Sequence, residues 1–110
     1  MVEPETLASI YEWQTRTFGV PYPRDLIGKL KEEIGELEEE IEVCTVSTDT
    51  SNRPMDKVKE ELIDNWIVLG GLLGVIFDGD FVAAAKERDR KMDINRNRDW
   101  NVRNGIGNHK

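Results

Sequence analysis

The chain has 110 residues, of which 34% are charged and 38% are apolar, and its formal net charge at pH 7 is −7. This length predicts a single domain, and the acidic balance argues against a general nucleic-acid-binding protein, which needs a basic face to displace counterions. The apolar fraction is too high for a wholly disordered chain. A small helical domain buries only part of its surface alone, so we expect an oligomer.

The start of the chain, its apolar runs and its single cysteine indicate a soluble, cytoplasmic protein. The first residues are acidic and lack the apolar segment of a signal peptide. The longest apolar run, Trp66 to Phe77, is shorter than the roughly 20 residues that a membrane-spanning helix requires. Cys44 has no second cysteine to pair with, which fits a reducing compartment. We expect no membrane partner.

The first two predicted helices follow from apolar residues that recur at helical spacing. The first helix opens at about Pro4 and ends near Phe18, with Gly19 as its stop signal. The second runs from about Asp25, which we interpret as its N-cap, to about Cys44. Its apolar stripe is formed by Leu30, Ile34, Leu37 and Ile41.

Two further helices complete the prediction. After a polar connection, 45–54, the third helix begins near Met55 and ends near Phe77. Glycines inside a helix each cost about 1 kcal/mol relative to alanine, so those in the third helix indicate close packing against another helix, either of the same chain or of a second subunit. They are Gly70, Gly71 and Gly74. The fourth helix runs from about Phe81 to about Asn95.

The predicted fold class is all-α. We expect an antiparallel helical bundle of four main helices, joined by short links and completed by oligomerisation. Residues 1–100 form one domain in this prediction, and residues 101–110 form a polar, flexible tail. No strand signal is found anywhere in the chain.

The second and third predicted helices each carry two carboxylates three residues apart, which places each pair on one face of its helix. The pairs are Glu33 with Glu36, and Glu61 with Asp64. If the two helices pack side by side, the four carboxylates converge, and their mutual repulsion has to be offset by a cation. Oxygen ligands alone favour magnesium or manganese over zinc, and Mg²⁺ commonly joins carboxylates to substrate phosphates. The alternative is an ordinary solvated acidic face.

A basic motif lies toward the end of the fourth predicted helix. Lys91, Asn95 and Arg98 are spaced four and three apart, so they share a face if the helix continues that far. Lysine and arginine donate charge-assisted hydrogen bonds to phosphate oxygens. The alternative is a solvated basic helix end that complements the helix dipole.

Three motifs follow one another in the order of these helices. Glu-Glu-x-x-Glu occupies 32–36, Glu-x-x-Asp occupies 61–64, and Lys-x-x-x-Asn-x-x-Arg-x-Trp occupies 91–100. Together they resemble the MazG-like family of all-α nucleoside triphosphate pyrophosphohydrolases, over roughly Asp25 to Trp100. The order and spacing of the motifs are more specific than any one of them.

The resemblance implies roles for particular residues. The residues that it implies as Mg²⁺ ligands and catalytic groups are Glu33, Glu36, Glu61 and Asp64. The residues that it implies as triphosphate contacts are Lys57, Lys91, Asn95 and Arg98. Glu32 matches the first acid of its motif, but its helical angle points away from the cluster. Trp13 is the first candidate to stack on a base, before Trp66 and Phe18, although aromatic residues at helical spacing also serve as core. Trp100 is expected to anchor the tail.

The resemblance further implies the reaction and the assembly. The expected activity is Mg²⁺-dependent hydrolysis of a nucleoside triphosphate, (d)NTP, to the monophosphate, (d)NMP, and pyrophosphate. The clearing of noncanonical nucleotides is one role that this activity could serve. Mn²⁺ is expected to substitute for Mg²⁺, and the enzyme is expected to be a homodimer or homotetramer. The alternatives are a phosphoribosyl-ATP pyrophosphatase, which has similar acidic helices, and a non-catalytic helical oligomerisation module.

Overall fold

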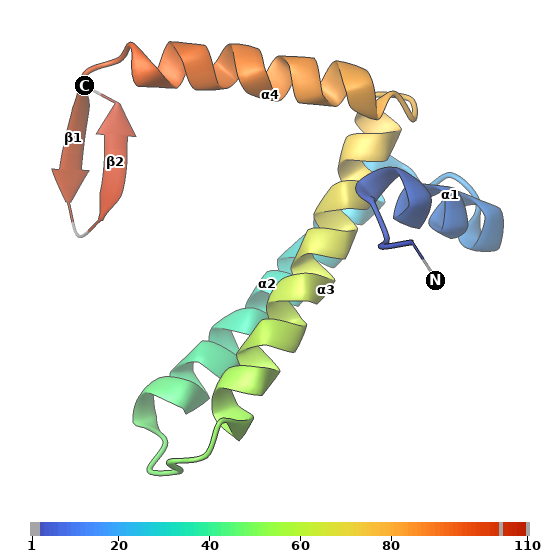
Figure 1. The fold of residues 1–110 in the computed structure, drawn as a ribbon. Helices are drawn as coiled ribbons and strands as arrows, with labels where there is room; N and C mark the ends of the chain where they lie inside the picture. Colours follow the sequence, from blue (N-terminus) through green and yellow to red (C-terminus); the bar gives the residue numbers. More distant parts are fainter. Residues whose placement is uncertain (1–2, 104, 110) are drawn as a thin grey trace.

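The protein consists of four helices followed by a β-hairpin (Figure 1). The computed structural model describes residues 3–103 and 105–109. The helices are α1 (Leu7–Phe18), α2 (Pro23–Val46), α3 (Arg53–Ile76) and α4 (Phe81–Arg96), and the strands are β1 (Trp100–Arg103) and β2 (Ile106–His109). Helix α3 contacts each of the other three helices, and the helical content confirms the all-α class expected from the sequence.

The ends of α1 and α2 differ slightly from the prediction because other residues cap them. Thr6 accepts a hydrogen bond from the backbone N–H of Ser9 at 3.0 Å, and the Ser9 hydroxyl accepts one from the backbone N–H of Thr6 at 2.7 Å. This capping box starts α1 later than Pro4. Asp25 was predicted to cap α2, but the N-cap is Tyr22, and Pro23 occupies the first turn, where its missing N–H is not needed.

The two longest helices, α2 and α3, form a helical hairpin. They lie side by side and run in opposite directions, joined by the short loop 47–52 (Figure 1). Both helices have 24 residues, so they remain paired over most of their length. The carboxylates predicted to converge are therefore carried by helices that do pack together.

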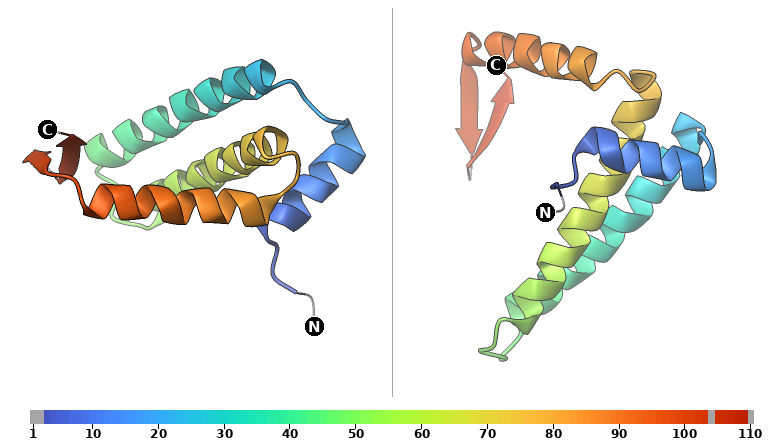
Figure 2. Two further views of the ribbon diagram at one scale, coloured as in Figure 1. Left: turned by 90° about the horizontal axis from the view of Figure 1, so that it is seen from above. Right: turned by 45° about the vertical axis from the view of Figure 1, so that its right-hand side comes forward.

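Helix α1 packs across the upper part of α3, where the three glycines lie (Figure 2). A Cβ atom built on Gly74 would lie 2.3 Å from the ring of Tyr11, and one on Gly70 would lie 2.8 Å from the side chain of Leu7. A larger residue at either position would have to displace the side chain of Tyr11 or Leu7. The close helix packing predicted from the glycines is therefore confirmed, and the helix that fills the space is α1 of the same chain.

Helix α4 leaves the end of α3 at an angle of 103°. The turn between them contains Asp78 and Gly79 with positive φ values of 53° and 79°, and Asp80 caps α4 by accepting a hydrogen bond from the N–H of Ala83 at 2.9 Å. Over the described residues, α4 contacts the rest of the chain mainly near this turn and projects away from α2 and α3 (Figures 1 and 2). A single chain therefore does not close a four-helix bundle, and the expected completion of the bundle by oligomerisation stays a prediction. Among the described helices, none alone is long and apolar enough to cross a membrane, and α3 with α4 reaches that length only across this bend.

The segment after α4 was predicted to be a tail without strands, and this was wrong: it folds into an antiparallel two-stranded hairpin. Gly105 adopts a φ of 79°, which glycine tolerates without strain and which allows the tight turn. The indole N–H of Trp100 donates to the backbone oxygen of Asn95 at 2.7 Å, and its ring lies close against Gly107. Trp100 thus anchors this segment to the end of α4, as the sequence suggested.

The described residues contain no fully buried apolar side chain. The chain exposes 8894 Å² and has a radius of gyration of 17.2 Å. A compact protein of this mass exposes about 6,200 Å², and a compact chain of this length has a radius of gyration of about 13 Å. One chain therefore leaves much of its apolar surface uncovered.

Candidate metal centre

Three carboxylates converge between α2 and α3. Glu33 comes from α2, and Glu61 and Asp64 come from successive turns of α3. One oxygen from each residue lies within 4.8 Å of the other two. The pairing of α2 with α3 is what brings Glu33 to the other two, and the three-residue spacing sets Glu61 beside Asp64.

The three carboxylates of the cluster differ in their exposure to solvent. Glu33 is only 7% exposed, Glu61 is half-buried and Asp64 is open to solvent. The Oε2 atoms of Glu33 and Glu61 are both buried and have no hydrogen-bond partner. Burying a carboxylate oxygen without a donor is costly, so these two atoms are candidate ligands for a cation.

One cationic side chain of α2, Lys29, partly offsets the negative charge of the cluster. The Nζ atom of Lys29 lies 3.1 Å from Oε1 of Glu33 and 3.8 Å from Oε2 of Glu32. The hydrogen bond to Glu33, helped by the charge of Glu32, raises the pKa of the Lys29 ammonium above its ordinary value. Lys29 reaches only one oxygen of Glu33 and is itself half exposed, so it leaves the buried Oε2 atom unpaired.

Glu36, the fourth predicted carboxylate, lies at the rim of the cluster. Its side chain is exposed and is not one of the three that converge most closely. The nearby charge of Glu33, followed by partial desolvation and the charge of Glu61, raises the pKa of the Glu36 carboxyl above its ordinary value. The charges of Glu33 and Glu61 therefore act on the Glu36 carboxyl, although it lies outside the set of three. Glu32, held to be secondary, is largely exposed and pairs with Lys29.

Asn65 joins the two helices at the cluster, and the sequence analysis missed it. Its Nδ2 group donates to the backbone oxygen of Glu33 at 3.1 Å and to the backbone oxygen of Glu61 at 2.8 Å. The residue is 8% exposed, and its Oδ1 atom is buried without a partner. Its position in the sequence could have indicated that it is buried. Asn65 follows Leu62 by three residues and precedes Leu69 by four, which places it on the apolar side of α3.

The donor set fits a hard divalent cation. Among the described residues, the buried side-chain atoms without a partner are the Oε2 atoms of Glu33 and Glu61 and the Oδ1 atom of Asn65. All three are acceptors: two are carboxylate oxygens of the cluster, and the third belongs to Asn65, whose amide nitrogen bonds the backbone of Glu33 and Glu61. Carboxylate and amide oxygens are the ligands that Mg²⁺ and Mn²⁺ prefer. A cation would both neutralise the carboxylates and satisfy oxygens that have no donor.

The residues predicted to contact phosphate do not all lie near the carboxylate cluster of the same chain. Lys57 lies one turn before Glu61 on α3, and its side chain is exposed. Lys91 and Asn95 lie toward the far end of α4, which Figure 1 shows well apart from the α2–α3 pair. Arg98 lies beyond the last residue of α4, Arg96, so the helix does not continue far enough to place all three residues on one helical face. The structure therefore leaves these three residues away from the carboxylates of their own chain.

A groove between α1 and α3 contains two of the aromatic residues singled out in the sequence. Its volume is about 670 Å³. Trp13 and Trp66 line it from opposite helices and are 52% and 48% exposed. Arg16 adds a cationic group, and it pairs with Glu12 at 3.9 Å. Phe18 does not line this groove, but its ring packs edge-on against Trp13 with centroids 5.5 Å apart.

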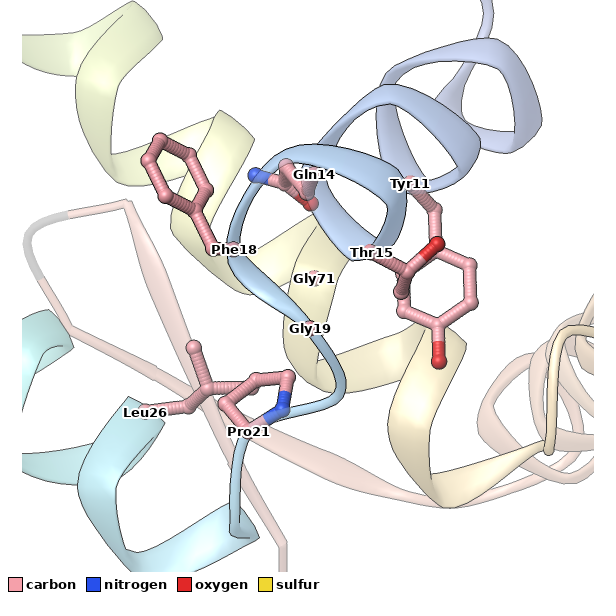
Figure 3. A pocket seen from close by; sticks show the side chains of 8 residues that line it. All are labelled: Tyr11, Gln14, Thr15, Phe18, Gly19, Pro21, Leu26 and Gly71. Atoms are coloured by element: carbon pink, nitrogen blue, oxygen red, sulfur yellow. The ribbon is translucent and has the colours of Figure 1, made fainter.

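A smaller pocket lies at the C-terminal end of α1 (Figure 3). Its volume is about 180 Å³, and Tyr11, Phe18 and Leu26 supply most of its apolar lining. Sites for small organic ligands usually measure at least about 300 Å³. The groove with the two tryptophans is therefore the better candidate for a nucleoside.

Comparisons of the chain with protein-family models, with curated proteins and with solved structures find no match. The assignment of the site accordingly depends on the contacts and burial of its own residues.

Proposed function

We propose that the protein is a Mg²⁺-dependent nucleoside triphosphate pyrophosphohydrolase that converts (d)NTP to (d)NMP and pyrophosphate in the cytoplasm. The observation that carries the proposal is the convergence of Glu33, Glu61 and Asp64, in which the buried Oε2 atoms of Glu33 and Glu61 have no hydrogen-bond partner among the described residues. The resemblance of the three motifs to MazG-like enzymes supplies the reaction class. Neither feature alone specifies the substrate.

In this proposal, Glu33, Glu61 and Asp64 hold the metal ion, with Glu36 beside them at the rim. When bound, the ion would neutralise phosphate charge and lower the pKa of a coordinated water. Mn²⁺ would occupy the same oxygen ligands.

Glu36 is the carboxylate best placed to accept a proton from the attacking water. It is exposed to solvent and is not one of the three carboxylates assigned to the metal, so it is free to accept a proton. The water oxygen forms a bond to the α-phosphorus while the bond from that phosphorus to the α–β bridging oxygen breaks. Pyrophosphate leaves with the bonding electrons, and the proton of the water passes to Glu36.

The phosphate-binding groups come from two places in the proposal. Lys57 lies one turn from Glu61 and can reach a phosphate beside the cluster. Lys91, Asn95 and Arg98 project with α4 away from their own cluster, so we assign them to the cluster of a second chain. The charge of the departing pyrophosphate would then be stabilised across the subunit boundary.

The assembly that this requires is a homodimer or homotetramer, in which helices of different chains complete the bundle. The exposed area exceeds that of a compact chain by roughly 2,700 Å². Obligate homodimer interfaces bury roughly 2,000 to more than 5,000 Å² in total. The exposed apolar residues of α2 and α3 supply suitable surface for such an interface; among them are Ile34, Ile41, Leu62 and Leu69.

The groove between α1 and α3 is the proposed nucleoside site. Trp13 and Trp66 line it and are each about half exposed, and stacking of a base on an aromatic ring contributes about 1–3 kcal/mol. The size of the groove, about 670 Å³, is sufficient for a nucleoside.

A non-catalytic oligomerisation module would explain the exposed apolar surface equally well. It would not explain why carboxylate oxygens are buried without donors at the contact between α2 and α3. A phosphoribosyl-ATP pyrophosphatase would share the metal centre and differ in its substrate.

The test is a panel of canonical, deoxy and modified triphosphates, with phosphoribosyl-ATP added, incubated with Mg²⁺ and then with excess chelator. The proposal predicts monophosphate and pyrophosphate only when metal is present, and their loss in Glu61→Gln. Glu38→Gln is the matched control, because Glu38 is an exposed glutamate of α2 outside the cluster. Turnover of phosphoribosyl-ATP alone would replace the proposed substrate class. No turnover of any substrate, with no binding of Mg²⁺, would favour the oligomerisation module.

A further inference from the structure

Asn65 is the only described residue whose side chain makes a hydrogen bond between α2 and α3. One amide group bonds the carbonyl of Glu33 on α2 and the carbonyl of Glu61 on α3. Both carbonyls belong to residues whose side chains enter the carboxylate cluster. The amide therefore connects the two backbone segments from which the cluster is built.

These bonds also fix how the amide is oriented. Both partners of Nδ2 are carbonyl oxygens, which accept hydrogen bonds and cannot donate them. The nitrogen must therefore face the two carbonyls, and Oδ1 must occupy the other position of the amide. There Oδ1 is buried and has no donor.

The unpaired Oδ1 atom argues against a purely structural role. Buried polar side chains that only hold a fold together normally have partners for their polar atoms. An apolar side chain on this side of α3 would have added to the helix contact without leaving an acceptor unsatisfied. Asn65 is instead buried to more than nine-tenths, between two carboxylate-bearing turns, with an oxygen left free.

We propose that Asn65 is the positioning residue of the carboxylate cluster, fixing the backbone of Glu33 against that of Glu61 so that their carboxylates meet one divalent cation. The inference rests on the proposed metal centre and adds a residue that its motifs do not contain. Without the amide, Glu33 and Glu61 remain on packed helices, but their relative position is no longer set by a direct bond. The metal then keeps fewer protein ligands and more water.

The experiment compares Mn²⁺ binding to the full chain and to its Asn65→Leu variant. Residues that orient metal ligands typically change metal affinity by about 10- to 100-fold when replaced. We expect Asn65→Leu to weaken Mn²⁺ binding at least tenfold while circular dichroism shows unchanged helix content. We also expect stronger relaxation of water protons per bound Mn²⁺, because lost carboxylate ligands are replaced by exchanging water.

Asn97→Leu is the matched control. The Nδ2 group of Asn97 donates to the backbone oxygen of Asp93 at 2.8 Å, a bond like that of Asn65 to Glu61 but exposed and at the C-cap of α4. Its loss should leave Mn²⁺ affinity and water relaxation unchanged. Because leucine is bulkier than asparagine, Asn65→Ser provides a second variant that removes the amide without adding volume, and it should weaken Mn²⁺ binding in the same way.

The outcomes separate the two proposals. If the unmodified chain binds Mn²⁺ and both Asn65 variants bind it equally well with the same water relaxation, the positioning role is overturned and the metal centre stands. If the unmodified chain binds no Mn²⁺, the metal centre is overturned, and the role of Asn65 in it is overturned as well.

Discussion

At the residue scale, the balance of charge in the cluster determines how the chain behaves without metal. Three carboxylates converge and a fourth lies close by, while Lys29 neutralises one oxygen of Glu33. Like charges held together oppose folding, and a bound cation reverses that effect. The following three predictions concern this balance.

Magnesium should stabilise the unmodified chain and should not stabilise Glu61→Gln. A ligand that binds only the folded state adds about 2.7 kcal/mol when its concentration is 100 times the dissociation constant. The variant loses one of the three converging carboxylates and, with it, some of their repulsion. Thermal unfolding with and without Mg²⁺ measures the effect. Equal stabilisation of both proteins would exclude Glu61 as a ligand.

Lys29→Gln should bind Mn²⁺ several-fold more tightly than the unmodified chain. Lys29 contacts Glu33 at 3.1 Å and competes with a metal ion for the same carboxylate. Lys31→Gln removes the same charge from an exposed position of α2 and should change the affinity less. Calorimetric titration measures both. A weaker affinity in Lys29→Gln would show that Lys29 supports the site instead of competing for it.

Glu36→Gln should be more stable than the unmodified chain at neutral pH and equally stable at low pH, both without metal. The pKa of Glu36 is raised above its ordinary value of 4.5, chiefly by the charge of Glu33, so the folded state holds this proton more tightly than the unfolded state. The unmodified chain therefore loses stability as pH rises from 4.5 through the raised pKa, whereas glutamine does not titrate. Urea unfolding of both proteins from pH 3.5 to 7.5 measures the difference. A difference that does not grow with pH would contradict the account.

At the element scale, the glycines of α3 decide how closely α1 approaches. In an exposed helix position, glycine-to-alanine replacement stabilises a protein by about 0.5–1 kcal/mol. Gly74 lies beneath the ring of Tyr11, where a Cβ atom would come within 2.3 Å of a ring carbon. The space needed for helix contact therefore outweighs the helix propensity of alanine at this position.

Gly74→Ala should destabilise the protein, although alanine is the better helix former. Gly28→Ala on α2 is the matched control, because no atom lies within 4 Å of the added Cβ, and it should stabilise by about 0.5–1 kcal/mol. Urea unfolding midpoints measure both changes. If both variants were stabilised alike, Tyr11 would not be packed against Gly74 as described.

The sequence predicted the helices and the carboxylate spacing well, because both depend on local periodicity. Glu61 and Asp64 share a face whatever surrounds α3. The burial of Asn65 depends on which side of α3 meets α2, and a single polar residue in an apolar stripe does not reveal its partners. The direction of α4 depends on the backbone angles of Asp78 and Gly79, and the strands of the hairpin are too short and polar to give a periodic signal.

At the scale of the whole molecule, the chain is extended and its apolar surface is incompletely covered. Its radius of gyration, 17.2 Å, exceeds the value of about 13 Å for a compact chain of this length. Helix α4 and the hairpin project from the body instead of packing on it (Figure 1). Both features agree with the proposed oligomer, in which a second chain covers the exposed faces.

The protein should therefore sediment as a dimer of about 25 kDa or as a tetramer of twice that mass, given a chain of 12.6 kDa. Leu69→Lys, which places a charge on an exposed apolar position of α3, should shift the mass toward one chain. Glu38→Lys is the control: it also introduces a lysine, but at an exposed position that is already charged, and it should leave the mass unchanged. A monomeric unmodified chain at micromolar concentration would contradict the shared site.

The most direct test of the metal centre is an anomalous difference map from a crystal grown with Mn²⁺ and measured at a wavelength where manganese scatters anomalously. The account predicts a peak between α2 and α3, within coordination distance of Glu33, Glu61 and Asp64. A peak confined to other carboxylates, or no peak at saturating Mn²⁺, would contradict it.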